Sequence, residues 1–154
     1  LLLGYTTKYY YYVLLLLGFT IMDNQELRNA GLKVTLPRVK ILQILEAKDV
    51  KHLSAEDVYK TLLDKNEDVG LATVYRVLTQ FETAGLVVRH NFDNGHSVFE
   101  MATDEHHDHM VVMDSGEIIE FHDDEIERLQ KKLVEEHGYE LVDHSLVLYV
   151  KAKS

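Results

Sequence analysis

Three histidines and an aspartate follow one another in a short stretch of the chain, His106-His107-Asp108-His109. Their ring nitrogens and carboxylate oxygens are ligands that divalent transition metals accept. If the stretch is extended, successive side chains point to opposite faces, so His106 and Asp108 face one way while His107 and His109 face the other. One short strand could therefore supply ligands to two separate metal sites.

Each of these sites would need two or three further nitrogen or oxygen ligands. The candidates are polar residues that stand alone in apolar surroundings: Glu100, Glu120, Glu127, His144 and, earlier in the chain, His52. Two alternatives stay open. A single histidine on an apolar strand, such as His144, is also typical of a hydrogen-bonded core residue, and the histidine-rich stretch could be a solvated loop.

The composition limits the classes of protein that fit. The chain has 154 residues, 46% of them hydrophobic as in soluble globular proteins, and it has no cysteine, which excludes disulfides, thiolate zinc sites and iron–sulfur clusters. The net charge of −10 argues against a protein that coats nucleic acid indiscriminately. Residues 22–100 carry ten Lys and Arg against twelve Asp and Glu, whereas residues 101–154 carry five against fourteen. Two charge regimes indicate two domains, of which only the first could meet DNA.

We expect these domains at residues 22–102 and 103–154. Residues 1–21 match neither, because they are apolar and aromatic with Lys8 as their single charge. They lack the basic flank and the small-residue cleavage site of a signal peptide. We interpret them as sequence from upstream of a native start at Met22, with a membrane anchor or an added partner-binding helix as the alternatives.

Helices dominate the first domain. Thr35 could cap a helix whose first turn contains Pro37, and Ser54 with Asp57 forms an acidic relative of the capping box before the next helix. A further helix is expected at about 70–84. The inner faces of these helices are predicted from apolar residues at helical spacing. They are Val39, Leu42 and Leu45, then Val58, Tyr59, Leu62 and Leu63, then Val74, Val77, Leu78 and Phe81.

A hairpin follows, because the apolar period changes from 3.6 to 2 after Gly85. Strands at 86–92 and 97–101 flank Asp93-Asn94-Gly95, and Asn-Gly is a strong hairpin signal. Helices followed by such a hairpin form a winged helix-turn-helix domain.

The second domain is predicted as a small α/β unit, so the fold class of the whole chain is α+β. Strands are expected at 109–113, 117–121 and 139–150, with a helix at 123–137 between the last two. The inward face of that helix is predicted from three apolar residues, Ile126, Leu129 and Leu133.

The polar face of the 70–84 helix fits a DNA major groove, which requires short side chains, cations and hydroxyl groups. Small residues there could contact a thymine methyl group, and the cations could bind guanine or phosphate. The hairpin residues Arg89, His90 and Asn91 could lie along a phosphate strand. The alternative is a helix face that is only solvated. The candidate contacts in and before this helix are Lys33, Arg38, Ala72, Thr73, Tyr75 and Arg76.

Four segments together resemble the ferric uptake regulator family: residues 31–38, 54–59, 70–78 and 106–109, within a similarity that runs from Leu27 to Lys151. The resemblance implies a cytoplasmic, non-enzymatic repressor that binds ferrous iron as corepressor and then occupies double-stranded operator DNA of iron-acquisition genes. It implies a homodimer, with a tetramer left open, and neither a small-molecule substrate nor a membrane partner.

The resemblance also implies two ligand sets. It matches Tyr75 and Arg76 to reading-helix contacts and Lys33 to a minor-groove contact. The first site draws on both domains, so metal binding there would clamp them. It would take Fe²⁺, with Mn²⁺ or Zn²⁺ able to substitute, and the second site would take another divalent metal such as Zn²⁺. The first set is His52, Glu100, His107, His109 and Glu120, and the second is His106, Asp108, Glu127 and His144.

Departures from the family pattern bear on the subtype. Many relatives hold a structural zinc on a Cys-x-x-Cys pair, but Val112 and Ser115 occupy those positions here, so that zinc site is absent. Zinc-responsive relatives use cysteine ligands, and peroxide-responsive relatives have aspartate where Glu100 and Glu120 stand. Iron sensing is therefore favoured, with a manganese- or peroxide-responsive regulator as the alternative.

Two other classes of function compete. A metallohydrolase would use the histidines for zinc and Glu100 or Glu120 as general base, but it leaves the winged helix unexplained. A metal store or a purely structural dimer module, with a membrane tether through residues 1–21 as an option, is the second, and DNA binding measured with and without metal would separate the three. The sequence does not decide between iron and manganese, because both accept the same nitrogen and oxygen ligands.

Overall fold

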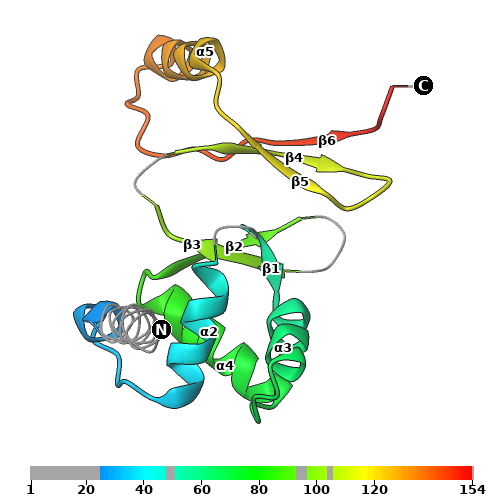
Figure 1. The fold of residues 1–154 in the computed structure, drawn as a ribbon. Coiled ribbons are helices and arrows are strands. Elements are labelled where there is room, and N and C mark those ends of the chain that lie inside the picture. Colours follow the sequence, from blue (N-terminus) through cyan, green and yellow to red (C-terminus); the bar gives the residue numbers. More distant parts are fainter. Residues whose placement is uncertain (1–24, 48–50, 93–96, 104–105, 154) are drawn as a thin grey trace, which may run out of the picture. The chain divides into compact units, whose positions relative to one another are not determined.

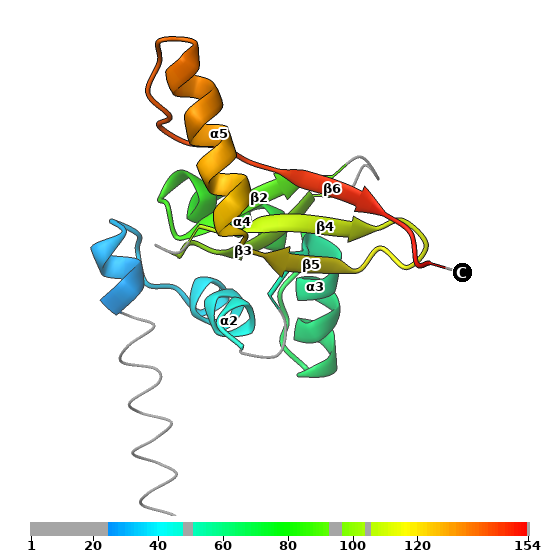
Figure 2. The same cartoon turned by 90° about the horizontal axis from the view of Figure 1, so that it is seen from above.

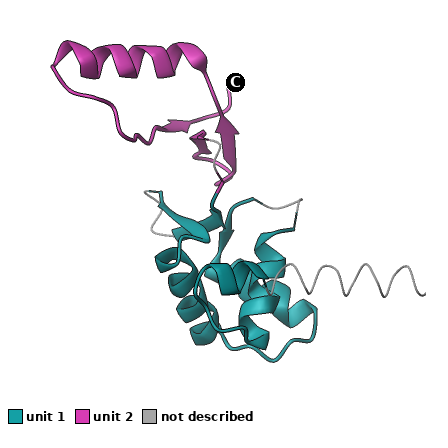
Figure 3. Ribbon diagram, turned by 90° about the vertical axis from the view of Figure 1, so that its left-hand side faces the viewer, with its two compact units in different colours: residues 1–102 teal, residues 103–154 magenta. Residues whose placement is uncertain are grey.

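The computed structural model describes residues 25–47, 51–92, 97–103 and 106–153. The chain divides into two compact units, residues 1–102 and 103–154 (Figure 3). The apolar segment 1–21 and the expected turn at 93–95 lie outside the described residues. In the described part of the chain, no helix is both long and apolar enough to cross a membrane.

Helices α2 (Leu36–Leu45), α3 (Ala55–Asp64) and α4 (Leu71–Thr83) pack around the core of unit 1, to which the helical residues 25–29 add the buried Leu27. Their inner faces are almost those predicted from the apolar period. Burying a large apolar side chain of this kind stabilises the fold by roughly 1.5–3 kcal/mol. Side chains with no exposed surface come from all three helices: Ile41, Leu42, Val58, Leu62, Val74, Leu78 and Phe81.

The start of α3 is fixed by a capping box. The Asp57 backbone N–H donates to Ser54 Oγ at 3.1 Å, and the Ser54 N–H donates to the Asp57 carboxylate at 3.0 Å. Thr35 is the N-cap residue of α2, as predicted, but its side chain makes no capping hydrogen bond. Pro37 lies in the first turn of α2, where its missing N–H leaves one donor fewer to satisfy.

The wing consists of β2 (Val87–Asn91) and β3 (Ser97–Met101), which pair antiparallel (Figure 1). A short strand, β1 (Leu53–Ser54), pairs with the other edge of β3. Gly85 has a φ of 72°, a conformation that favours glycine, and it turns the chain from α4 into β2. Three helices followed by this hairpin form the expected winged helix.

Unit 2 is a three-stranded sheet with one helix. Its strands β4 (Asp108–Val112), β5 (Ile118–Phe121) and β6 (Val147–Val150) lie in the order β5-β4-β6 (Figure 2). Strand β5 pairs antiparallel with β4, whereas β6 pairs with β4 in parallel. Helix α5 (Asp124–Glu136) connects β5 to the segment that leads into β6.

The predicted last strand at 139–150 is too long, because only its final four residues are a strand. Strand β5 ends beside the start of β4, and the parallel strand β6 begins at that same end of the sheet, so the chain has to come back there from the far end of α5. Residues 139–146 make this passage without regular structure. The passage ends where the Leu146 N–H donates to Asp108 Oδ1 at 3.2 Å.

Three residues predicted to face inward are exposed. Leu63 is the neighbour of the buried Leu62 on α3 and lies 100° further round the helix. On α5, Leu129 is 50% and Leu133 57% exposed, and no residue of this helix is buried. Within unit 2, α5 stands off the sheet (Figure 3). Its apolar stripe is therefore uncovered in a single chain.

Candidate metal centre and nucleic-acid interface

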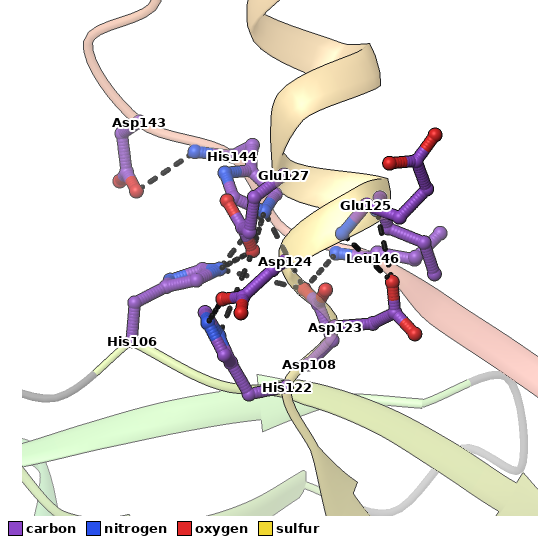
Figure 4. Close-up of polar contacts among 11 residues, drawn as sticks. His106, Asp108, His122, Asp123, Asp124, Glu125, Glu127, Asp143, His144 and Leu146 are labelled. Carbon is purple, nitrogen blue, oxygen red and sulfur yellow. Dashed lines mark hydrogen bonds and ion pairs between the residues drawn. The ribbon is translucent and has the colours of Figure 1, made fainter.

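Four predicted ligands meet in unit 2. His106 precedes β4, Asp108 begins β4, Glu127 lies in the first turn of α5, and His144 lies in the irregular passage before β6. One possible ligand atom of each residue lies within 4.8 Å of the others. Figure 4 shows these side chains pointing toward one another from three different segments. We refer to these four residues as the unit 2 cluster.

The distances between the ligand atoms of the unit 2 cluster are those expected around a single metal ion. The Nε2 atoms of His106 and His144 are 2.9 Å apart. Asp108 Oδ1 lies 3.5 Å and 3.7 Å from these two nitrogens, and Glu127 Oε1 lies 3.6 Å and 3.3 Å from them. Ligand atoms about 2.0–2.2 Å from a shared metal are separated by similar distances.

Burial makes a bound cation favourable at this cluster. Asp108 is 1% exposed. Glu127 Oε1 is buried and, among the described residues, has no hydrogen-bond partner. A buried carboxylate oxygen without a partner is costly unless a cation or donor satisfies it. Two imidazole nitrogens and two carboxylate oxygens also form a donor set that iron, manganese and zinc accept. The residues present therefore fit a divalent metal.

The start of α5 holds Glu127 in place. The Asp123 side chain accepts hydrogen bonds from the Glu125 and Ile126 N–H groups, both at 3.0 Å. Beside it, His122 Nε2 lies 3.1 Å from Asp124 Oδ1, and His122 Nδ1 lies 3.9 Å from Glu127 Oε1 (Figure 4). His122 could not be selected from its sequence pattern, since its neighbours along the chain are acidic and it follows the end of a strand.

In unit 1, the two oxygens of Glu100 are held by two imidazoles. His52 Nε2 lies 3.0 Å from Glu100 Oε2, and His90 Nε2 lies 2.7 Å from Glu100 Oε1. Burial by itself would raise the pKa of this carboxyl group. Hydrogen bonds from His52 and His90 outweigh that effect and place the pKa of Glu100 far below its ordinary value. Glu100 is therefore a carboxylate at neutral pH, suited to a cation.

The remaining candidates for the first predicted site lie in unit 2. The rings of His107 and His109 are 5.0 Å apart in an edge-on arrangement, and His109 pairs with Glu120 between β4 and β5. The structure thus places His107 with His109 and His106 with Asp108, the two pairs derived from alternation. The strand itself begins only at Asp108.

A cationic pocket lies on unit 1 between the start of α2 and the exposed side of α4. Lys33, Arg38, Thr73, Arg76 and Gln80 are among the residues that line it. The Arg38 guanidinium is fixed there, because it donates to the Lys33 carbonyl at 2.6 Å and to Gln80 Oε1 at 2.9 Å and 3.3 Å. The pocket combines positive charge and hydroxyl groups, as a phosphate contact requires.

The predicted reading residues are accessible on α4. Ala72, Tyr75 and Arg76 are exposed, and Thr73 is partly exposed. The Tyr75 hydroxyl donates to Glu56 Oε1 at 2.6 Å, and this hydrogen bond raises the pKa of Tyr75 above its ordinary value. A carboxylate from α3 thus holds a candidate reading side chain.

Arg89, a predicted wing residue, is held by three contacts within unit 1. It pairs with the Glu82 carboxylate at 2.8 Å, donates to Thr79 Oγ1 at 3.3 Å and lies over the Phe99 ring at 5.0 Å. These contacts hold Arg89 against its own unit, and its contact with a phosphate strand stays a prediction. The sequence did not show them, because Glu82 and Phe99 belong to different elements.

Known proteins resemble the chain along most of its length. The model of the ferric uptake regulator family matches residues 29–149. The ferric uptake regulation protein of Pseudomonas aeruginosa is 69% identical over 133 residues, which are 86% of this chain and 99% of that protein.

Solved structures agree with this similarity. The ferric uptake regulator of P. aeruginosa with manganese has a TM-score of 0.74 at 68% identity, over 86% of this chain and 98% of that one. The ferric uptake regulator of Francisella tularensis with iron has a TM-score of 0.75 at 47% identity, over 80% of this chain and 93% of that one. From the family match and these similarities, together with the winged helix and the clusters of metal-binding residues, the chain belongs to the ferric uptake regulator family.

Proposed function

We propose that this chain is an iron-responsive transcriptional repressor that binds operator DNA of iron-acquisition genes when a divalent metal is bound. The observation that carries the proposal is the presence, in one chain, of a winged helix with a cationic pocket and of a cluster of two imidazoles and two carboxylates around the buried Asp108. Either feature alone would also fit other classes of protein, whereas the two together indicate a metal-dependent regulator. In this proposal unit 1 is the DNA-binding domain and unit 2 the metal-binding and dimerisation domain.

The exposed side of α4 is the surface that we assign to the DNA major groove. Arg76 and Tyr75 are placed to reach base edges, while Ala72 and Thr73 allow close approach to a thymine methyl group. Lys33 and Arg38 flank the helix at the cationic pocket and are assigned to the DNA backbone and minor groove.

Two ligand sets are proposed for metal. The unit 2 cluster holds one ion. The second set, implied by the family, consists of His52, Glu100, His107, His109 and Glu120, the first two in unit 1 and the others in unit 2. When bound, Fe²⁺ supplies positive charge and coordination positions, and Mn²⁺ or Zn²⁺ can substitute for it. Binding there would favour one arrangement of the two domains, and a difference in metal affinity between arrangements becomes a difference in DNA affinity.

The charge of unit 2 supports the same coupling. Residues 101–154 carry fourteen acidic residues against five basic ones, so without cations this half of the molecule repels DNA. Neutralising the carboxylates of the buried Asp108 and the half-buried Glu127 lowers that repulsion. Metal therefore acts on DNA affinity through charge as well as through domain arrangement.

A homodimer is proposed because unit 2 leaves apolar surface uncovered. Leu129 and Leu133 on α5 are half exposed, and Val142 in the passage after it is 94% exposed. In the described part of unit 2, strands β5 and β6 each pair with β4 alone, so each has a free edge. Two copies would cover these surfaces and present two reading helices to a two-fold related operator, which one protomer could not grip specifically.

Non-enzymatic action in the cytoplasm is part of the proposal. A metallohydrolase keeps one coordination position open for water, whereas the unit 2 cluster already brings four protein ligands together. The winged helix also has no role in hydrolysis. If the chain were a metal store, the cationic pocket of unit 1 would have no function.

Operator binding measured with and without metal tests the proposal. A random-sequence duplex library is selected on the chain with Mn²⁺, and an enriched duplex is labelled for fluorescence anisotropy with Fe²⁺ under anaerobic conditions, with Mn²⁺, and with chelator. Binding is expected only with metal. Equal binding after chelation, or no enriched sequence, would contradict the proposal.

Two double variants assign the sites: His107→Ala with His109→Ala, and His106→Ala with His144→Ala. The first is expected to abolish the metal response while the fold is kept. His137→Ala is the matched control, because this histidine bonds the Leu133 carbonyl at the end of α5 and belongs to neither ligand set.

A further inference from the structure

We propose that His90 is a positioning residue that orients Glu100 toward a metal shared with His52. This inference rests on the proposed function, since it concerns the ligand set to which His52 and Glu100 are assigned. His90 was expected on the wing surface facing DNA. Its side chain is instead only 17% exposed and is directed at the Glu100 carboxylate.

The wing hairpin brings the two residues together. Glu100 on β3 pairs with Val88 on β2, and His90 lies two residues further along β2. Residues two apart on a strand share one face, so His90 is the diagonal neighbour of Glu100 on the same side of the hairpin. Phe92, two residues further again, stacks on the His90 ring at 5.7 Å with an angle of 4° between the planes. The imidazole is therefore held by its backbone and by its ring neighbour.

The contacts divide the two Glu100 oxygens between two partners. An ionised carboxylate only accepts hydrogen bonds, so His90 Nε2 is the donor to Oε1 at 2.7 Å. The other oxygen, Oε2, is the one that faces His52 Nε2 at 3.0 Å. With Oε1 engaged, Glu100 presents a single oxygen beside the nitrogen of His52, so its rotation about the last side-chain bond is restricted.

Such a partner affects metal binding without touching the metal. Groups that hydrogen-bond a ligating side chain fix its orientation, and their removal typically lowers metal affinity about 10- to 100-fold. His90 is such a group, because it hydrogen-bonds the predicted ligand Glu100. The proposal attributes the effect of His90 on metal affinity to its N–H group and not to its ring. Variants that keep only the ring or only a donor therefore test it.

The test uses two substitutions that separate the ring from the donor. His90→Phe keeps a ring to stack on Phe92 but removes the N–H group, whereas His90→Gln removes the ring but keeps an amide donor of similar reach. Both are made in the full chain carrying His106→Ala and His144→Ala, which removes the unit 2 cluster. His137→Gln in the same background is the control for replacing a histidine by glutamine.

Cobalt binding is measured by titration of the visible absorption of Co²⁺, and the stability of the metal-free chain by thermal unfolding. His90→Phe is expected to weaken Co²⁺ binding about 10- to 100-fold, while His90→Gln recovers most of the affinity with an unchanged Co²⁺ spectrum. His137→Gln should match its parent.

Three results would overturn the proposal. Unchanged Co²⁺ affinity in folded His90→Phe would make His90 a structural residue only. Equal loss in both variants, with an altered Co²⁺ spectrum, would make His90 a ligand itself. Weak binding that tracks a lowered unfolding temperature in both would assign the loss to folding. None of these readouts uses DNA, so failure of this inference is distinguishable from failure of the proposed repressor function, which anisotropy reports.

Discussion

At the scale of single residues, the chemistry of the chain depends on side chains whose partners are distant in sequence. The His106–His109 stretch could be sorted into two pairs by alternation alone, and the structure places the pairs in that way. His90 and His122 could not be selected from sequence, because their contacts with Glu100 and Glu127 arise from strand register and from the turn into α5. Local spacing predicts which residues share a face, but not which face meets another element.

Gln80 is expected to matter for DNA binding although it need not touch DNA. It accepts two hydrogen bonds from the Arg38 guanidinium and so holds that cation at the pocket. Gln80→Ala should weaken operator binding several-fold while leaving the salt dependence nearly unchanged, because no charge is lost. Arg38→Ala should reduce the slope of log affinity against log salt by about one. Anisotropy titrations over a range of salt concentrations would measure both, and a reduced slope in Gln80→Ala would contradict this assignment.

Metal binding should weaken as the pH falls below about 6, because histidine binds metal only when neutral and ordinarily titrates near pH 6.5. Glu100 should not cause this loss. Its pKa is lowered, so it stays ionised well below the range in which histidines gain protons. Mn²⁺ affinity measured between about pH 5 and 8 should therefore fall on the acid side. An affinity that stays constant over this range would indicate carboxylate ligands without histidine.

At the scale of elements, the apolar period predicted what is buried more reliably than how each element begins or ends. The core face of α4, with Val74, Val77, Leu78 and Phe81, follows from spacing because every fourth or third residue faces the same way. The start of the final strand could not be predicted, since the passage at 139–146 exists because the chain has to come back from the far end of α5 to the place where β6 pairs with β4. That tertiary requirement also brings His144 to the unit 2 cluster.

The two predicted helix caps differ in the structure, and this difference can be measured. Ser54→Ala removes a capping box and should lower the free energy of unfolding of unit 1 by about 0.5–2 kcal/mol. Thr35→Ala is the control, because the Thr35 side chain makes no capping hydrogen bond and its removal should change stability little. Urea unfolding followed by circular dichroism would compare the two. A larger loss in Thr35→Ala than in Ser54→Ala would contradict the capping geometry.

At the scale of the whole molecule, the exposed apolar surface of unit 2 is what supports the proposed dimer. The family's Cys-x-x-Cys positions are Val112 and Ser115 here, so a zinc bound by that pair cannot stabilise the unit. In a single chain α5 buries none of its residues, so its predicted inner face needs a second surface. The amphipathic pattern of α5 is present as predicted, but among the described residues no element covers its apolar face, which we assign to a second copy of the chain.

The α5 stripe gives a direct test of the dimer. Leu129→Glu combined with Leu133→Glu should convert a dimer to a monomer in sedimentation velocity, because charges in a covered apolar surface are strongly unfavourable. Helix content should stay similar, since both side chains are half exposed in a single chain. Operator binding should weaken together with dimerisation, because a monomer presents one reading helix to a two-fold site.

This test needs a control that separates the effect of added negative charge from the effect of losing the apolar surface. Lys131→Glu changes the net charge by the same amount as the two leucine substitutions, and Lys131 is an exposed residue of the same helix, 200° from each leucine. This variant should remain a dimer. If it dissociates like the leucine variant, repulsion in an already acidic unit controls assembly. If neither dissociates, the pairing uses the strand edges of β5 or β6, because those edges are the other unpaired feature of the described unit 2.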